Sequence, residues 1–127
     1  MKETPILKRI LLHCGHGATR LFRRNVGRGW IGESVRLPNG NVLIKNARPF
    51  HSGFEGQSDL DGWHSIIITP EMIGRKLAIY TAMEVKTATG RVKKSQAKHI
   101  ELVLAAGGIA GVVRSPEDAE ELLNEIK

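Results

Sequence analysis

The sequence predicts an α/β fold in a single domain, residues 1–127, with a mixed central sheet flanked by helices and a β-hairpin inserted into it. Residues 77–85 form an apolar run with a period of two (Leu77, Ile79, Thr81, Met83 and Val85), which is typical of a strand, and apolar residues then recur at helical spacing over residues 93–106. Pro38-Asn39-Gly40 separates two extended stretches and favours a hairpin turn, since Asn-Gly supports the positive φ that such turns need. The 127 residues, 41% of them hydrophobic, suffice for one core.

The first half of the chain predicts one helix, one strand and the hairpin. Thr4 and Pro5 are typical of an N-cap and a first helical position, and apolar residues at helical spacing continue as far as Cys14. The segments that follow are expected to be a strand at residues 18–26, a loop around Gly27, Gly29 and Gly32 whose backbone can approach a ligand closely, a hairpin at residues 34–44, and a polar loop at residues 46–58.

The second half predicts a strand, a short turn, a βαβ unit and a final helix. Its elements are expected to be a core strand within residues 58–68 that ends in Ile66-Ile67-Ile68, a helical turn at Thr69-Pro70-Glu71 ended by Gly74, a strand at residues 77–85, a turn at residues 87–90, a helix at residues 93–106 ended by Gly107-Gly108, a buried strand at residues 109–113, and a helix that begins at Ser115-Pro116-Glu117-Asp118. This last start is strong, because it combines an N-cap serine, a proline and two acids at the positive end of the helix dipole.

The charge of the chain is uneven. The formal net charge is +6, and residues 117–127 hold five acids and one base, so residues 1–116 carry 18 bases against 8 acids. Such a basic region suits a polyanion, of which nucleic acid is the usual example. An ordinary basic soluble protein has the same balance, so charge alone leaves both readings open.

The single cysteine, Cys14, excludes an intrachain disulfide and fits a reducing compartment. Lys8 and Arg9 interrupt the one apolar run near the N-terminus, so we expect no signal peptide. No apolar run approaches the roughly 20 residues that a membrane span needs. His13, Cys14 and His16 are too few ligands for a closed zinc site, and we expect Cys14 to lie in the buried stripe of its helix.

Two carboxylates are candidates for metal binding. Asp59 begins one core strand and Glu84 ends the next, so the two side chains converge if these strands pair. Carboxylates about 4 Å apart repel by roughly 4 kcal/mol at an effective dielectric of about 20, so one must be protonated or a cation must lie between them. Oxygen ligands suit Mg²⁺ or Mn²⁺, which lowers the pKa of bound water and neutralises phosphoryl charge.

Lys86 leaves the strand on the same face as Glu84, roughly 6.6 Å along it. From there its ammonium group can orient an attacking water or stabilise the transition state. A surface ion pair between Glu84 and Lys86, worth about 0–1 kcal/mol, explains the same pattern. The spacing by itself favours that simpler interpretation.

A resemblance to a known family changes this balance. Gly56-Gln57-Ser58-Asp59, Met83-Glu84-Val85-Lys86-Thr87-Ala88-Thr89-Gly90-Arg91 and Gln96 resemble the VRR-NUC (virus-type replication-repair nuclease) domain of the PD-(D/E)XK nuclease superfamily. Leu21-Phe22-Arg23-Arg24-Asn25-Val26-Gly27 and residues 106–116 are similar to it as well, so the match covers nearly the whole chain. The resemblance implies a restriction-endonuclease-like core and a stand-alone protein of the phage or prophage type, acting in the cytoplasm of a bacterial host.

The resemblance also implies roles for individual residues. Asp59 and Glu84 would be metal ligands with the Val85 carbonyl as a third, and Lys86 would be the catalytic lysine. Two further residues would join the site: Gln96, on the helix after the motif strand, and Glu3, an acid on or near the first helix. Ser58 replaces the proline of the superfamily name. Asp61 is an alternative ligand, but Asp59 precedes Leu60 as the pattern requires.

Several polar and cationic residues are candidate phosphate contacts: Arg23, Arg24, Asn25, Arg28, Arg91, Lys93 and Lys94. Solvated surface charge explains any single one of them equally well. Trp30 and Trp63 are able to stack on an unpaired base, although core or hairpin packing is the commoner role. His99, on the helix after the motif strand, is a further candidate for the site.

The sequence therefore predicts a Mg²⁺- or Mn²⁺-dependent DNA nuclease, and the resemblance points to branched DNA, four-way junctions included. The alternatives are an exonuclease, a flap or nick nuclease, and a non-catalytic DNA-binding module on the same fold. A junction has two strands to cut, so a two-fold homodimer is expected. The hairpin at residues 34–48 would serve either that dimer interface or DNA binding.

Overall fold

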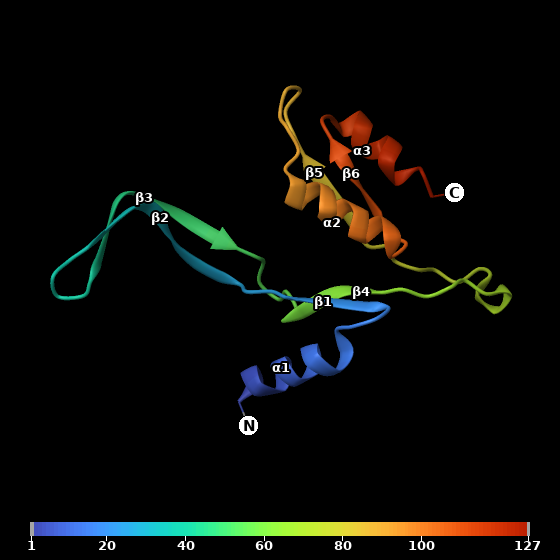
Figure 1. Cartoon of the computed structure of the whole chain (residues 1–127), viewed down its shortest axis with the longest axis horizontal. Helices are drawn as coiled ribbons and strands as arrows, with labels where there is room; N and C mark the ends of the chain where they lie inside the picture. Colours follow the sequence, from blue (N-terminus) through green and yellow to red (C-terminus); the bar gives the residue numbers. More distant parts are fainter. Residues whose placement is uncertain (1, 127) are drawn as a thin grey trace. The chain divides into compact units, whose positions relative to one another are not determined.

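The computed structural model describes residues 2–126, which form a mixed α/β structure (Figure 1). This part of the chain divides into two compact units. Unit 1 runs up to His13 and then over Leu21–Asp61, and unit 2 comprises Cys14–Arg20 and the chain from Gly62 onward. The single domain expected from the sequence stays a prediction.

The first helix, α1 (Glu3–Cys14), is confirmed, but it begins at Glu3, so the predicted N-cap at Thr4 is wrong. The prediction that it buries an apolar stripe is wrong. No described residue of α1 is buried, and Cys14 is exposed. The reason is that no other helix or strand of the described chain packs extensively against α1.

The hairpin of unit 1 is longer than predicted. It consists of β2 (Gly27–Arg36) and β3 (Val42–Ser52), which pair antiparallel (Figure 1). The loops expected around Gly27, Gly29 and Gly32 and at residues 46–58 are therefore wrong over most of their length. Glycine has a low strand propensity, but main-chain pairing needs no side chain and here overrides it.

Two glycines shape the hairpin: Gly40 in its turn and Gly32 at a β-bulge. The predicted turn is confirmed, with Gly40 at φ 88° and its N–H donating to the Leu37 carbonyl at 3.0 Å. The pairing register shifts between Ile31 and Glu33, which indicates a β-bulge. At the bulge a Cβ on Gly32 would lie 2.5 Å from the Lys45 carbonyl oxygen, so only glycine fits.

Strand β1 (Thr19–Arg23) is confirmed and pairs with β4 (Leu60–His64). The predicted continuation of the latter strand through Ile66-Ile67-Ile68 is wrong. These three residues lie outside any strand, and the Ile67 side chain is 89% exposed, because no described strand pairs with them. The helical turn that follows is confirmed as η1 (Pro70–Met72).

Unit 2 contains the predicted βαβ unit. Strands β5 (Thr81–Val85) and β6 (Ile109–Val113) pair in parallel, and α2 (Lys94–Ala105) connects them. Strand β5 begins later than the alternation from residue 77 predicts. The buried apolar side chains of the described chain all belong to this unit: Val103, Ile109, Ala110 and Val113.

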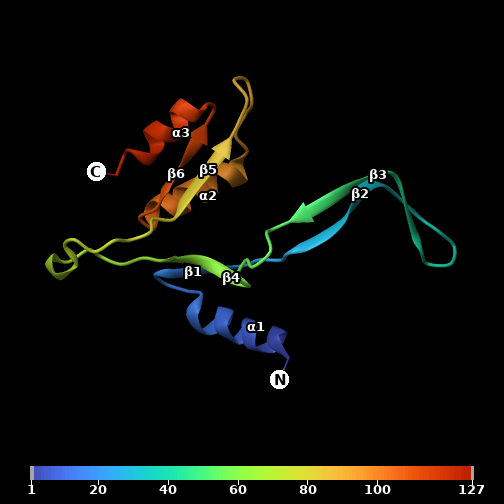
Figure 2. The same ribbon diagram turned by 180° about the vertical axis from the view of Figure 1, so that it is seen from behind.

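Helices α2 and α3 (Pro116–Leu123) cover opposite faces of the β5–β6 pair (Figure 2). Gln96 of α2 contacts Glu84, which is paired with Val112 on one face. Leu122 of α3 packs over Gly111, the residue before Val112 on β6. Because successive residues of a strand point to opposite faces, Gly111 and Leu122 mark the face opposite to Glu84. This layer arrangement buries both sides of a short parallel sheet.

The ends of these helices match the sequence signals. Gly107 adopts φ 93° after α2, and the N–H groups of Gly107 and Gly108 donate to the carbonyls of Leu104 and Val103, as in a Schellman motif. The Ser115 hydroxyl accepts from the Asp118 N–H at 3.0 Å and caps α3.

The described strands form three two-stranded sheets. A mixed α/β structure is therefore established, whereas the single central sheet belongs to the proposal below. No helix within residues 2–126 is long and apolar enough to cross a membrane.

Candidate functional site

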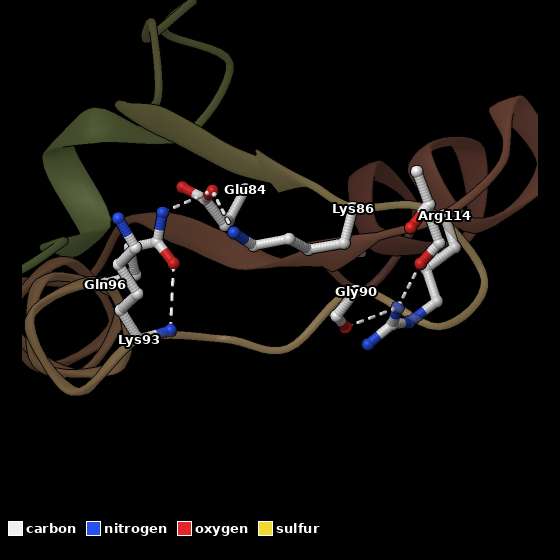
Figure 3. A network of polar contacts seen from close by, with 7 residues as sticks. Glu84, Lys86, Gly90, Lys93, Gln96 and Arg114 are labelled. Atoms are coloured by element: carbon white, nitrogen blue, oxygen red, sulfur yellow. Dashed lines mark hydrogen bonds and ion pairs between the residues drawn. The ribbon is translucent and has the colours of Figure 1, made fainter.

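The end of β5 brings Glu84 and Lys86 together in unit 2 (Figure 3). The Lys86 Nζ lies 3.4 Å from the Glu84 Oε1, and the two side chains are 17% and 30% exposed. The Lys86 N–H donates to the Val113 carbonyl at 3.0 Å, so pairing with β6 fixes the lysine backbone. The period of two along the strand thus places both charged groups on one face.

Gln96 joins this pair from the first turn of α2. Its Nε2 donates to the Glu84 Oε1 at 2.7 Å, and its Oε1 accepts from the Lys93 N–H at 2.9 Å. The amide oxygen of Gln96 thus bonds to the start of α2, and the amide nitrogen bonds to Glu84 on β5 (Figure 3). Glu84, Lys86 and Gln96 therefore form a connected group built from two elements.

Two oxygens at the end of β5, the Oε2 of Glu84 and the carbonyl oxygen of Val85, suit a hard cation. Both contacts of the Glu84 carboxylate fall on Oε1, which leaves Oε2 for another ligand. The Tyr80 carbonyl accepts from Ile109, and Lys86 donates to Val113, so the even-numbered residues of β5 face β6. The Val85 carbonyl must then point to the opposite edge of the strand. A carboxylate and a carbonyl oxygen are donors that Mg²⁺ or Mn²⁺ prefers.

Arg114 holds the turn that follows Lys86, a role that the sequence analysis missed. Its Nη1 donates to the carbonyls of Thr87 and Gly90, the second at 3.0 Å (Figure 3). Its own N–H donates to the Asp118 Oδ2 at 2.9 Å. The sequence did contain a signal for this role. In a parallel pair the residue after β6, Arg114, must lie beside the residue after β5, Lys86.

The acids of unit 1 have different surroundings. Asp59 lies immediately before β4 with its side chain exposed, and its carbonyl accepts from the Arg24 N–H at 2.9 Å. Asp61 lies on β4, and its Oδ1 accepts from the Arg24 Nε at 2.7 Å. The carboxylate of Asp61 is thus engaged with a cation through one oxygen, as the carboxylate of Glu84 is.

The predicted metal ligands and catalytic residues are divided between the units. Glu3 and Asp59 belong to unit 1, and Glu84, Val85, Lys86 and Gln96 belong to unit 2. Within residues 2–126, no three His, Cys, Asp or Glu side chains gather closely enough to hold a metal ion. A cation shared by Asp59 and Glu84 is therefore part of the proposal below.

The predicted phosphate contacts also fall into two groups. Arg23, Asn25 and Arg28 are exposed in unit 1, where the Arg24 guanidinium pairs with Asp61 and lies 5.2 Å from the Phe22 ring centroid. The predicted phosphate contacts of unit 2 are exposed and lie just before α2 or at its first residue: Arg91, Lys93 and Lys94.

The aromatic and histidine candidates for the site differ in solvent exposure. Trp63 packs against Tyr80 with ring centroids 4.9 Å apart. Trp30 of β2 is 63% exposed. His99 is half-buried on α2, three residues beyond Gln96.

Comparison of the chain with known protein families, with curated proteins and with solved structures finds no match.

Proposed function

We propose that this protein is a divalent-metal-dependent DNA nuclease of the VRR-NUC type, with a restriction-endonuclease-like core built on a mixed central sheet. The observation that carries the proposal is the contact of Lys86 and Gln96 with one carboxylate oxygen of Glu84. A simple surface ion pair needs no third partner, and Lys86 is largely buried. The phage-type cytoplasmic setting belongs to the same proposal.

In this proposal Glu84, the Val85 carbonyl and Asp59 would hold Mg²⁺ or Mn²⁺, with Glu3 as a further acid. When bound, the ion supplies Lewis acidity and neutralises charge on the phosphodiester. Lys86 donates hydrogen bonds to the attacking water or to a phosphoryl oxygen. Gln96 keeps the Oε1 of Glu84 occupied, which would leave the other oxygen for the ion.

The first test is cleavage of labelled four-way junctions in Mg²⁺ or Mn²⁺ by the wild type, Glu84→Gln and Lys86→Met. We expect each variant to lose at least about 100-fold in rate, the scale on which removal of one transition-state donor acts. Junction binding in EDTA should survive. The exposed α2 residues Glu101 and Lys98 supply matched controls, Glu101→Gln and Lys98→Met, which should cleave normally.

Equal cleavage by the wild type and Glu84→Gln would contradict the proposal. Binding without any cleavage by the wild type in either metal would favour a non-catalytic DNA-binding module.

The second test compares four-way junctions, flaps, nicked duplex, intact duplex and single strands. The proposal expects paired cuts in the junction and a dimer in sedimentation. Release of mononucleotides from ends would favour an exonuclease, and cutting confined to flaps or nicks would favour a repair nuclease.

A further inference from the structure

The β2–β3 hairpin of unit 1 is strongly basic. Residues 27–52 contain four basic side chains and one acidic side chain, Glu33. Glu33 lies opposite Lys45 in the pairing register, so the negative charge of Glu33 is balanced by a positive charge within the hairpin. Three exposed arginines are left without a neighbouring acid across the strands: Arg28, Arg36 and Arg48.

The part of the hairpin next to its ends, residues 27–31 and 48–52, is called here the basal half. In it Arg28 lies opposite His51, and Trp30 lies opposite Pro49. Residues two apart on a strand share a face, so the Trp30 indole and the Arg28 guanidinium leave the same face. Arg48 lies opposite Ile31 and leaves the other face. The basal half thus carries a cation on each face and an exposed indole on one.

The hairpin is stabilised mainly by the pairing of its own two strands. Neither β2 nor β3 packs extensively against another element of the described chain, and Figures 1 and 2 show the pair as a long two-stranded ribbon. An isolated two-stranded hairpin is only marginally stable in water. A ribbon of this kind fits the B-DNA major groove, which is about 12 Å wide.

We infer that the basal half of the hairpin is a DNA-binding surface that lies in the groove of a duplex arm. Arg28 and Arg48, on opposite faces, meet the phosphates of the two strands that border the groove. Trp30 packs on the sugars and base edges beside Arg28. This inference rests on the proposed function for its partner, DNA, and charge complementarity selects that partner over a second copy of the chain.

The test measures binding of the full-length protein to a fluorescent duplex in EDTA, where metal-dependent cleavage is absent. Arg28→Gln/Arg48→Gln removes two phosphate contacts, so the slope of log K against log salt should become shallower by about 1.8. We expect affinity at low salt to fall about tenfold or more. Arg75→Gln/Lys76→Gln, which removes two exposed charges from unit 2, should leave the slope unchanged.

A second readout reports Trp30 alone. The chain has two tryptophans, so in Trp63→Phe the fluorescence comes only from Trp30. Duplex DNA should change this fluorescence in Trp63→Phe, and the change should be lost in Trp63→Phe/Arg28→Gln/Arg48→Gln.

Three outcomes would overturn the inference. The first is a wild-type salt slope in Arg28→Gln/Arg48→Gln with normal junction cleavage, which leaves the proposed function intact. The second is dissociation of a dimer in that variant during sedimentation, which would assign the basal half to a second copy. The third is failure of the wild type to bind or cleave any DNA, which would remove the proposed function as well.

Discussion

Gln96 is the residue that couples helix α2 to the Glu84 carboxylate, because an amide offers a donor and an acceptor at once. Gln96→Leu removes the hydrogen bond to Oε1 and frees the carboxylate to rotate. We expect nuclease activity to fall about 10–100-fold, as for other residues that orient a metal ligand. Single-turnover cleavage at saturating DNA measures this loss, and a higher metal concentration should restore part of it.

A Gln96→Leu protein with wild-type rates and wild-type metal dependence would contradict this role. Glu101→Gln, on an exposed position of the same helix, is the matched control and should leave both quantities unchanged.

Arg114 acts on the turn after Lys86 through two backbone carbonyls, those of Thr87 and Gly90. A lysine has the charge but lacks the planar fork that reaches both acceptors. We therefore expect Arg114→Ala and Arg114→Lys each to lower the free energy of unfolding by about 1 kcal/mol, measured by urea denaturation. Cleavage by the folded variants should fall more than this loss of stability explains, because the turn adjoins Lys86.

Full activity in Arg114→Lys would show that charge, and not the two hydrogen bonds, is what the position supplies.

At the scale of elements, the bulge at Gly32 makes a sharp prediction about the hairpin. A Cβ at Gly32 would lie 2.5 Å from the Lys45 carbonyl oxygen and 2.7 Å from the Ile44 Cγ2, so the strands must separate. Gly32→Ala should speed amide hydrogen exchange throughout the part of the hairpin beyond the bulge. At Gly29 the nearest atom is 3.5 Å away, an ordinary contact, so Gly29→Ala is the matched control.

Equal exchange rates in Gly32→Ala and Gly29→Ala would mean that the bulge is not where the strands constrain each other.

Elements were predictable where their signals are local. The Ser115 cap, the Gly107-Gly108 stop and the Asn39-Gly40 turn each depend on a few consecutive residues, and all three were confirmed. The part of β2 before Ser34 was missed because Gly27, Gly29 and Gly32 have a low strand propensity. The strand expected at Ile66-Ile67-Ile68 failed for the converse reason, since apolar β-branched residues still need a neighbour to pair with.

At the scale of the whole molecule, the proposal requires Asp59 and Glu84 to bind one ion. Isothermal titration with Mn²⁺ tests this through Asp59→Asn, Glu84→Gln and the double variant. If one ion uses both ligands, each single change should weaken binding at least about tenfold, and the double change should add little, because contacting residues are non-additive. Independent, additive losses would mean that the carboxylates serve different sites.

The candidate site was partly predictable for a physical reason. Glu84 and Lys86 lie two residues apart on one strand, so their shared face followed from the period of the strand. The sequence by itself determined this pair, the helix ends and the excess of positive charge, because each depends on residue type or on neighbours in the chain.

Only the tertiary structure decided which distant groups touch. It placed the Gln96 amide on Glu84, the Arg114 guanidinium on the turn after Lys86, and Arg24 on Asp61. These contacts join residues 12, 24 and 37 positions apart. A hydrogen bond forms only when donor and acceptor lie about 3 Å apart. The packing of strands and helices decides which distant residues come that close, and the spacing of those residues along the chain does not reveal it.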